Sequence, residues 1–255
     1  ATYSLTSSSG VRIERGQSNY VNYFSPEIVD WAGYTTRSGI ASVPKIPELD
    51  AVGSMVKSIE NVDFNFTGSS YEYVLTKGQN SANCVPFISQ SVSAYSAYEI
   101  LMDVYFLEPD ILRFSSFGST CTHTVKGSIV EFEPDQVRVQ QGQFFTTETE
   151  ALVTISGVDL TKTALKSYHQ LSNTQIYFNY TSQVRGSFTT ASGLSFVRGF
   201  NTGAVAGHYY VFEALDDQFS VQSGLDYVTA TNISLVLNDK APRHTSFTLF
   251  PSSYN

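Results

Sequence analysis

"THTVKGSIVEFEPDQVRVQQG", residues 122–142, is the stretch that decides the predicted fold class. Val130 and Phe132 alternate with glutamates, and Val137 and Val139 resume the alternation with polar residues after a proline. A period of two, with apolar residues on one face, is the pattern of a half-buried strand. We therefore predict two short strands around a turn.

The polar positions of this stretch include three acids, Glu131, Glu133 and Asp135. Paired carboxylates serve acid/base hydrolysis, but that chemistry also needs a pocket that raises one pKa, and this stretch supplies none. Arg138 lies on the presumed partner strand, so a cross-strand pair between glutamate and arginine is the simpler account. Charges on a hairpin also discourage edge-to-edge aggregation. We predict that these acids are pairing partners and gatekeepers, and not catalysts.

Similar alternating runs recur along the chain from Asn61 onward and indicate roughly ten strands with turn signals between them. Residues 61–67, "NVDFNFT", alternate in this way, and residues 70–78, "SYEYVLTKG", follow across a glycine turn. We expect these two runs to form a hairpin.

Three segments show helical signals instead. Residues 25–33, "SPEIVDWAG", have Ser25 as an N-cap and a proline at the first helical position. Residues 46–60 place apolar residues at steps of three and four. Residues 159–173, "DLTKTALKSYHQLSN", have Asp159 as a cap and give the best predicted helix. Residues 93–109 fit either a buried helix or a buried strand.

The whole pattern predicts an all-β, mainly antiparallel chain, a β-sandwich or jelly roll with two or three inserted short helices. No internal repeat, low-complexity linker or clear boundary is evident. We expect residues 1–24 to be a polar arm or a first strand, and residues 25–255 to be one domain.

The composition excludes several classes of function. Charged residues are 15% of the chain, against the roughly 25% typical of soluble domains. The net charge is −8, and the basic residues are scattered, whereas binding a phosphate backbone needs clustered Lys and Arg. No apolar run is long enough to span a bilayer, and no signal-peptide pattern opens the sequence. Weakly charged strand faces suit a protein that packs against other subunits, or a secreted protein with a neutral surface.

Motifs for nucleotide binding, metalloprotease or serine-hydrolase chemistry are missing from the sequence. The four histidines, His123, His169, His208 and His244, are isolated, and we interpret them as surface or capping residues. Cys84 and Cys121 fit either one disulfide or two buried thiols.

Two acidic patterns resemble cation sites. Residues 61–72 place Asn61, Asp63, Asn65 and Glu72 at the spacing of a calcium loop, but Phe66 stands where such a loop needs glycine. We therefore predict a plain amphipathic strand.

Asp216 and Asp217, with Asp226 nearby, form the second acidic pattern, which we interpret as a solvated turn. The sequence thus predicts no catalytic, cofactor-binding or metal-ligating residue, and no cofactor. The sequons at Asn65, Asn179 and Asn232 are as many as chance gives, so they are no evidence for secretion.

Aromatic side chains mark several strands. They are Tyr71 and Tyr73; Tyr177, Phe178 and Tyr180; and Tyr209, Tyr210 and Phe212. Exposed rings could stack on sugars, whereas in an ordinary sandwich one ring of each set fills the core. The one tryptophan, Trp31, falls inside a predicted helix, which weakens the sugar-binding interpretation.

The leading hypothesis is a non-enzymatic structural subunit that self-assembles through β-sheet surfaces and a terminal arm. A virion capsid or tail protein, or an extracellular filament subunit, fits this description. Its expected partners are copies of itself or a companion structural protein, without direct nucleic-acid contact, and its expected location is the virion or the extracellular space. The alternative is a carbohydrate-binding adhesin or lectin-like module that binds a glycan. A hydrolase and a β-pore toxin rank behind these two.

Overall fold

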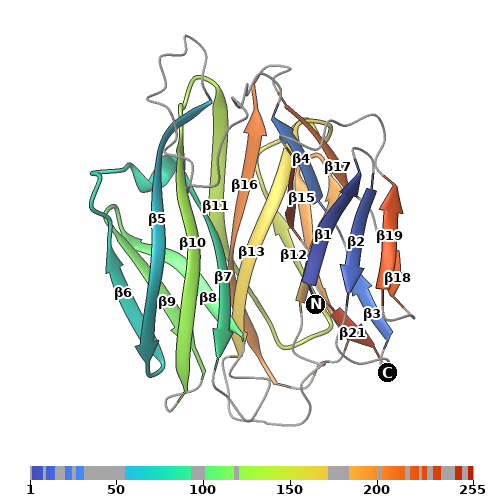
Figure 1. The fold of residues 1–255 in the computed structure, drawn as a ribbon, viewed down its shortest axis with the longest axis horizontal. Helices are drawn as coiled ribbons and strands as arrows, with labels where there is room; N and C mark the ends of the chain where they lie inside the picture. Colours follow the sequence, from blue (N-terminus) through green and yellow to red (C-terminus); the bar gives the residue numbers. More distant parts are fainter. Residues whose placement is uncertain are drawn as a thin grey trace.

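The computed structural model describes most of the chain between 55 and 215, and the backbone course of short segments on either side (Figure 1). The described residues are 2–7, 10–14, 21–24, 27–31, 55–92, 101–117, 121–171, 184–199, 201, 203–215, 219–223, 226–228, 232–236, 245–248 and 252–254.

These residues form an antiparallel all-β fold, as the sequence predicts. The three predicted helices are wrong. Strands β4 (Glu27–Trp31), β5 (Val56–Thr67) and β13 (Thr163–Leu171) lie where helices were expected, and the ambiguous segment contains strand β8 (Met102–Glu108). Helical structure in the described part of the chain is limited to the short 3-10 turn η1 (Ser81–Asn83), and no helix there could cross a membrane.

Residues 56–132 form a first unit of six strands in two three-stranded sheets. One sheet has the order β5-β10-β7 and the other the order β6-β9-β8. Beside β5 and β8, its strands are β6 (Ser70–Val74), β7 (Cys84–Val92), β9 (Ile111–Ser116) and β10 (Thr122–Phe132). If the six strands are numbered in chain order, which gives each a strand position from one to six, the two sheets have the orders one–six–three and two–five–four.

Residues 137–214 form a second unit with the same strand order. Its sheets are β11-β16-β13 and β12-β15-β14, again one–six–three and two–five–four. Beside β13, its strands are β11 (Val137–Thr146), β12 (Glu150–Thr154), β14 (Val184–Thr190), β15 (Gly193–Arg198) and β16 (Val205–Ala214). The expectation that the chain has no internal repeat is therefore wrong at the level of topology.

A third unit with this order is built from two distant segments, 2–31 and 219–254. The later segment supplies positions one to three, and the earlier segment supplies positions four to six. Position one is β17 (Phe219–Ser223) with β18 (Asp226–Val228), position two is β19 (Asn232–Val236), and position three is β20 (Thr245–Thr248) with β21 (Ser252–Tyr254). Position four is β1 (Thr2–Ser7), position five is β2 (Gly10–Glu14), and position six is β3 (Val21–Phe24) with β4. Sheet β1-β2-β19 is its two–five–four sheet. Sheets β17-β4-β20 and β18-β3-β21 are the two halves of its one–six–three sheet.

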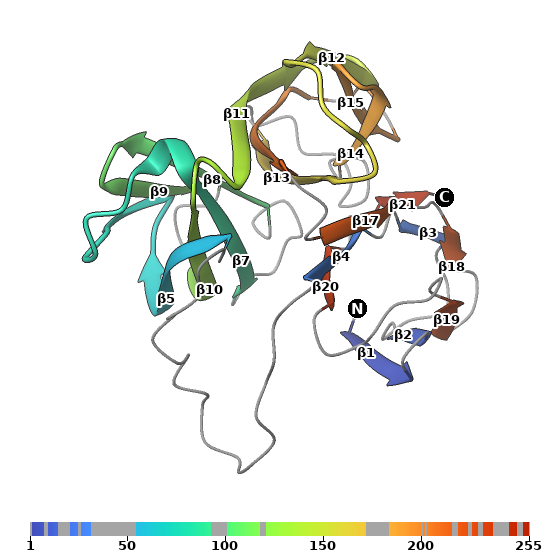
Figure 2. The same ribbon diagram turned by 90° about the horizontal axis from the view of Figure 1, so that it is seen from above.

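The register confirms this assignment, because residue i of the second unit corresponds to residue i + 82 in positions one to three of the third. Val137, Glu150 and Thr163 pair with residues of the second unit that correspond to the partners of Phe219, Asn232 and Thr245 in the third. For example, Thr163 pairs with Glu213 and Thr245 with Asp30, and each partner is next to last in strand position six. All three hairpins between positions four and five also carry a register shift at the same place. Figure 2 shows the three units as separate groups of strands.

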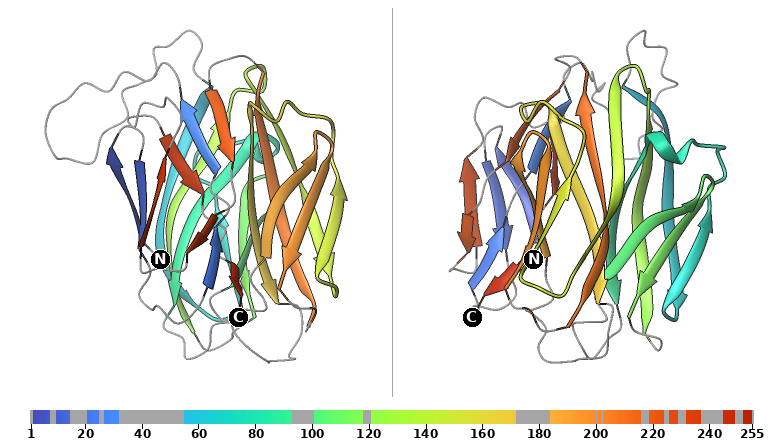
Figure 3. Two further views of the ribbon diagram at one scale, coloured as in Figure 1. Left: turned by 90° about the vertical axis from the view of Figure 1, so that its right-hand side faces the viewer. Right: turned by 180° about the vertical axis from the view of Figure 1, so that it is seen from behind.

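The sheets of a unit face each other across an apolar core. In the second unit, Phe144 of β11 stacks on Phe196 of β15 with ring centroids 3.9 Å apart, and Leu165 and Val211 pack in the same cluster. The core of the first unit includes residues from a third sheet, because Ala164, Tyr210 and Phe212 of the second unit lie in it. Sheet β11-β16-β13 is therefore a wall shared by two cores, and it stands between them in Figure 3.

Two buried tyrosines tie this shared wall to the first unit. The Tyr168 hydroxyl donates to the Pro86 carbonyl and accepts from the Ile88 amide, both at 2.8 Å, so it satisfies backbone groups on the open edge of β7. The Tyr210 hydroxyl donates to the Val104 carbonyl at 3.0 Å. Burial raises the pKa of both tyrosines, which keeps each hydroxyl neutral and able to donate.

We expect Tyr168→Phe to lower the free energy of unfolding by about 1–3 kcal/mol, because it leaves a buried amide and carbonyl unpaired. Urea denaturation monitored by fluorescence measures this loss. Tyr71→Phe, at a ring that is 39% exposed, is the control and should change stability little. Equal stability of the Tyr168 variant and the wild type would contradict the bridging role.

Candidate functional site

An acid occupies the same place in all three units, next to the last residue of strand position six. Glu131 of β10 pairs in register with Cys84, Glu213 of β16 with Thr163, and Asp30 of β4 with Thr245. Each of these three partners is the first residue of its strand. Because the acids recur in register, they are the strongest candidate site in the chain.

In the first unit this acid is buried and fully engaged. The Glu131 carboxylate accepts from Lys57 Nζ at 2.9 Å, Ser58 Oγ at 3.0 Å and the Asn80 backbone amide at 3.1 Å. Burial pushes the pKa of Glu131 upward, but the hydrogen bonds from Lys57, Asn80 and Ser58 outweigh it, and the pKa is lowered from its ordinary value. The group therefore stays an anion that fastens the connection between β6 and β7.

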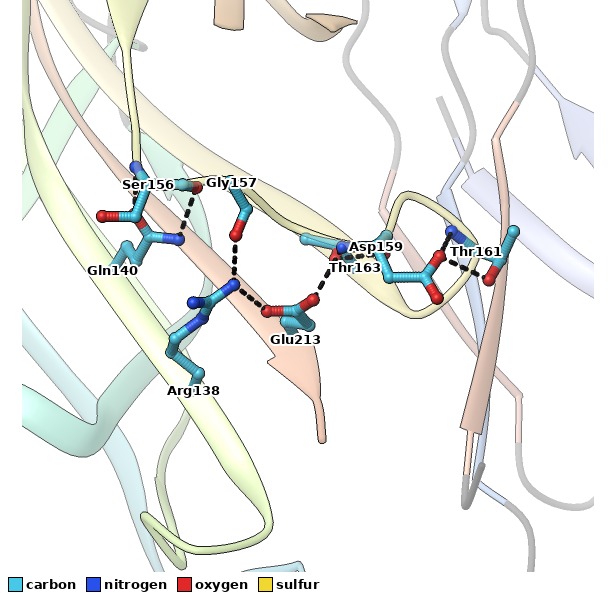
Figure 4. A network of polar contacts seen from close by, with 8 residues as sticks. All are labelled: Arg138, Gln140, Ser156, Gly157, Asp159, Thr161, Thr163 and Glu213. Carbon is cyan, nitrogen blue, oxygen red and sulfur yellow. Dashed lines mark hydrogen bonds and ion pairs between the residues drawn. The ribbon is translucent and has the colours of Figure 1, made fainter. Parts of the chain in front are cut away.

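Glu213 plays the same part in the second unit (Figure 4). Its carboxylate accepts from Arg138 and, at 2.6 Å, from the Asp159 backbone amide. Arg138 also donates to the Gly157 carbonyl. The connection between β12 and β13 is thus held by the equivalent acid and a cation from strand position one.

Asp159 is part of the same hydrogen-bond network, in the connection between β12 and β13. It does not cap a helix, as the sequence analysis predicted. Its carboxylate accepts from the Thr161 amide at 2.9 Å and the Thr161 hydroxyl at 2.7 Å, and these bonds lower the pKa of Asp159. The Thr163 hydroxyl donates to the Asp159 carbonyl. The result is a tight turn that leads directly into β13.

A second anchor lies further along strand position one, three residues after Lys57 in the first unit and two residues after Arg138 in the second. In the first unit, Glu60 accepts from the Thr76 amide at 3.1 Å and from the Tyr73 hydroxyl at 2.9 Å. In the second unit, Gln140 accepts from the Ser156 amide at 2.8 Å. Both connections between positions two and three are therefore fixed at two points. Burial and the bond to Glu60 raise the pKa of Tyr73 to about 12, so it remains a donor.

The predicted pair between a glutamate of 122–142 and Arg138 is wrong. Strands β10 and β11 are joined by the predicted turn but belong to different sheets, so Arg138 pairs with Glu213 and Glu131 with Lys57. Strand β10 is central in its sheet, so Glu131 is not an edge gatekeeper. The expected hairpin of 61–67 and 70–78 is also wrong, because β5 pairs with β10 and β6 with β9.

The described histidines form no cluster, because His123 lies in the first unit and the side chains of His169 and His208, on neighbouring strands, lie on opposite faces of sheet β11-β16-β13. His208 Nδ1 lies 2.7 Å from the Asp103 carboxylate, and its ring stacks on Tyr105, which joins the second unit to the first. Burial raises the pKa of Asp103, although its bonds to His208 oppose this. His123 is buried against Phe66, with Nε2 3.0 Å from the Ser116 hydroxyl.

The remaining two histidines add no cluster. His169 is half-buried and accepts from the Val184 amide at 3.3 Å, so it caps a backbone group at the start of β14, which is one of the two roles expected. His244 lies outside the described residues. The described part of the chain contains no group of three His, Cys, Asp or Glu residues placed to hold a metal ion.

Asn61, Asp63 and Asn65 of the acidic near-match lie on β5, the amphipathic strand predicted, and Glu72 lies on β6. Asp63 pairs with Lys126 at 3.2 Å, Asn61 accepts from Ser128 at 2.8 Å, and Glu72 lies 3.7 Å from Arg113. Asp216 and Asp217 lie outside the described residues, and Asp226 is in β18. Cys84 and Cys121 are buried thiols and are not joined in a disulfide, and burial raises the pKa of Cys84 to about 12.

The aromatic sets mostly fill cores. Tyr209 faces the core of the second unit, while Tyr210 and Phe212 face that of the first. Tyr71 is partly exposed and stacks on Phe66 with ring centroids 5.5 Å apart. The set at 177–180 lies outside the described residues.

No protein-family model matches this chain, and the search of curated proteins gives no match. The interpretation of the site therefore depends on its own geometry. The site holds the backbone in place, because Glu131 and Glu213 each accept a hydrogen bond from a backbone amide of the connection between strand positions two and three.

We expect Glu131→Gln to lose about 1–3 kcal/mol of unfolding free energy at pH 7, because the amide cannot accept the charged and neutral donors together. A lowered folded-state pKa gives stability that is present above the ordinary value of 4.5 and is lost as pH falls through the folded-state pKa. The gap between wild type and variant should therefore shrink below about pH 4.5.

Urea denaturation of both proteins at a series of pH values measures this gap. Glu133→Gln, in the turn after β10, is the matched control and should stay within about 0.5 kcal/mol of wild type. A gap that persists unchanged at acid pH would show that the charge of Glu131 is not what stabilises the fold.

Proposed function

We propose that the protein is a non-enzymatic structural subunit that self-assembles through its β-sheet surfaces, in a virion or an extracellular filament. The observation that carries the proposal is the contrast between equivalent sheet faces of two units. In the second unit, the outer face of the one–six–three sheet, with Tyr210, Phe212 and Ala164, is buried against the first unit. In the second unit, therefore, this sheet face is apolar and is covered by another unit.

The equivalent face of the first unit is apolar at one end, where Val85 and Val130 correspond in register to Ala164 and Phe212 and pack in the core; the rest is polar, neutral and half-buried or exposed. We call it the outer polar face; it comprises Asn61, Asp63, Asn65, Thr67, Ser89, Ser91, Thr122, Thr124, Lys126 and Ser128. Its two charged residues pair with each other, and its hydroxyls pair across strands, as Thr67 does with Thr122 at 3.0 Å. Covering such a face costs less desolvation than covering unpaired charges.

The engagement of the buried acids supports the same proposal. Glu60, Glu131 and Glu213 all bind the backbone of their own units. A general acid or base must instead reach a substrate proton. These carboxylates serve the rigidity that a repeating subunit needs.

Sedimentation velocity over a range of protein concentration, pH and salt tests the proposal, with negative-stain electron microscopy of the concentrated sample. We expect association that rises with concentration, and rings, shells or fibres in the images. Ser91→Lys adds an unpaired charge to the outer polar face and should weaken association. Thr154→Lys, at an exposed position of β12, is the matched control. A protein that stays monomeric in every condition would contradict the proposal.

Carbohydrate binding is the second candidate, and one observation favours it. The Tyr71 ring is 39% exposed and is held by Phe64 and Phe66, which orders it as a stacking surface. We expect any glycan bound on an array to be lost in Tyr71→Ala and kept in Val74→Ala, a neighbouring exposed residue of β6. An array without binding would remove this candidate.

A further inference from the structure

The connection that leads from strand position six of one unit to position one of the next differs in length between the units. It has four residues after the first unit, 133–136, and four after the second, 215–218. After position six of the third unit it has 24 residues, 32–55, between β4 and β5. The connection after β4 is therefore six times as long as the other two.

The third unit depends on both of its segments. The segment 2–31 contributes β2, the centre of sheet β1-β2-β19, and β3 and β4, the centres of the two halves of the other sheet. The segment 219–254 contributes β19 and the strands on either side of β3 and β4. Without 2–31, the strands of the later segment would have no central strand to pair with.

The reach of the connection allows the segment 2–31 to leave its own molecule. An extended chain spans at most about 3.3–3.6 Å per residue, so 24 residues reach about 80 Å. A compact chain of this length has a radius of gyration of about 18 Å. Four residues reach only about 14 Å, which confines the equivalent connections to neighbouring strands.

We propose that the third unit is an assembly site of the protein, in addition to the outer polar face, and that its partner is the segment 2–31 of a second copy. In the exchanged form, β2, β3 and β4 of one molecule pair with β17–β21 of the next through the same register that they have within one chain. This inference rests on the proposed function and adds a second contact by which the subunit self-assembles.

The energetics favour such an exchange at high concentration. Every backbone hydrogen bond of the unit is kept, so exchange costs mainly the freedom of independent molecules, which concentration offsets. If each copy donates its segment to the next, the contact is head-to-tail and extends into a chain of subunits.

Disulfide trapping with full-length chains tests the proposal. Arg12 of β2 and Ser234 of β19 are partners in register, at a separation that two cysteines can bridge. Arg12→Cys and Ser234→Cys are made as separate variants, one carrying an affinity tag. They are unfolded together, refolded at high concentration and oxidised. Only exchange places Cys at 12 of one variant against Cys at 234 of the other.

We expect a disulfide-linked heterodimer on a non-reducing gel, in an amount that rises with concentration. The two native cysteines are buried, and each single variant refolded alone is the control for random coupling. The double variant, refolded dilute, should form the bond within one chain and so verify the register. Asn22→Cys and Val228→Cys, partners in β3 and β18, repeat the test if Arg12 is needed for folding.

The outcomes separate the two proposals. Assembly of the mixture without a heterodimeric disulfide would overturn exchange and leave self-assembly standing. A mixture that stays monomeric at every concentration would overturn both. A dilute double variant that cannot close its own disulfide would contradict the pairing of β2 with β19 on which the exchange is built.

Discussion

A carboxylate buried next to the end of a central strand is the constraint on which the first and second units depend. Such a group is stable only as a paired and hydrogen-bonded anion. In each unit the donors come from two sources, a cation on strand position one and a backbone amide of the connection that follows position two. The acid therefore forces the connection to pass close to the end of strand six, and this fixes where strand three begins.

The shared wall extends that local constraint to the whole chain. Once Glu213 has set the start of β13, the outward residues of this strand face the first unit, where the Tyr168 hydroxyl satisfies the edge of β7. The first unit thus borrows a side of its core from the second. Neither core is complete without the sheet between them, so we expect the two units to unfold cooperatively.

The sequence could predict the fold class but not the roles of particular residues. Strands with one face in a core, such as β10, follow the period of two and were predicted correctly. Strand β13 has both faces buried, so Ala164, Leu165 and Tyr168 are all apolar, and their spacing imitates a helix. The partners of Glu131 could not be predicted, because the turn at 133–136 joins two sheets and Lys57 lies 74 residues away.

The repeat did leave a trace in the sequence, at an offset of 82 residues. Nine residues between 135 and 173 are identical to the residue 82 positions later: Asp135/Asp217, Gln136/Gln218, Val139/Val221, Gln140/Gln222, Gly142/Gly224, Thr147/Thr229, Thr149/Thr231, Thr163/Thr245 and Asn173/Asn255. Gly142 has a physical reason, since a Cβ there would lie 2.5 Å from the Tyr209 hydroxyl. The trace is hidden because half of the third unit precedes the first, and because the offset between the first and second units varies along the chain.

A few side chains decide whether a one–six–three sheet faces protein or solvent. Tyr210 of the second unit is matched in register by Ser128 of the first, and Tyr168 by Ser89. Each tyrosine is buried with a backbone partner from a neighbouring unit, whereas each serine bonds within its own sheet. Serine in place of tyrosine at these two positions removes apolar area, but the strands keep the same pairing register. The outer polar face therefore has the same strand arrangement as the sheet that lies between the two cores. A sheet face with paired charges and short side chains suits reversible contact between copies, because covering it leaves no charge unpaired and uncovering it exposes no core.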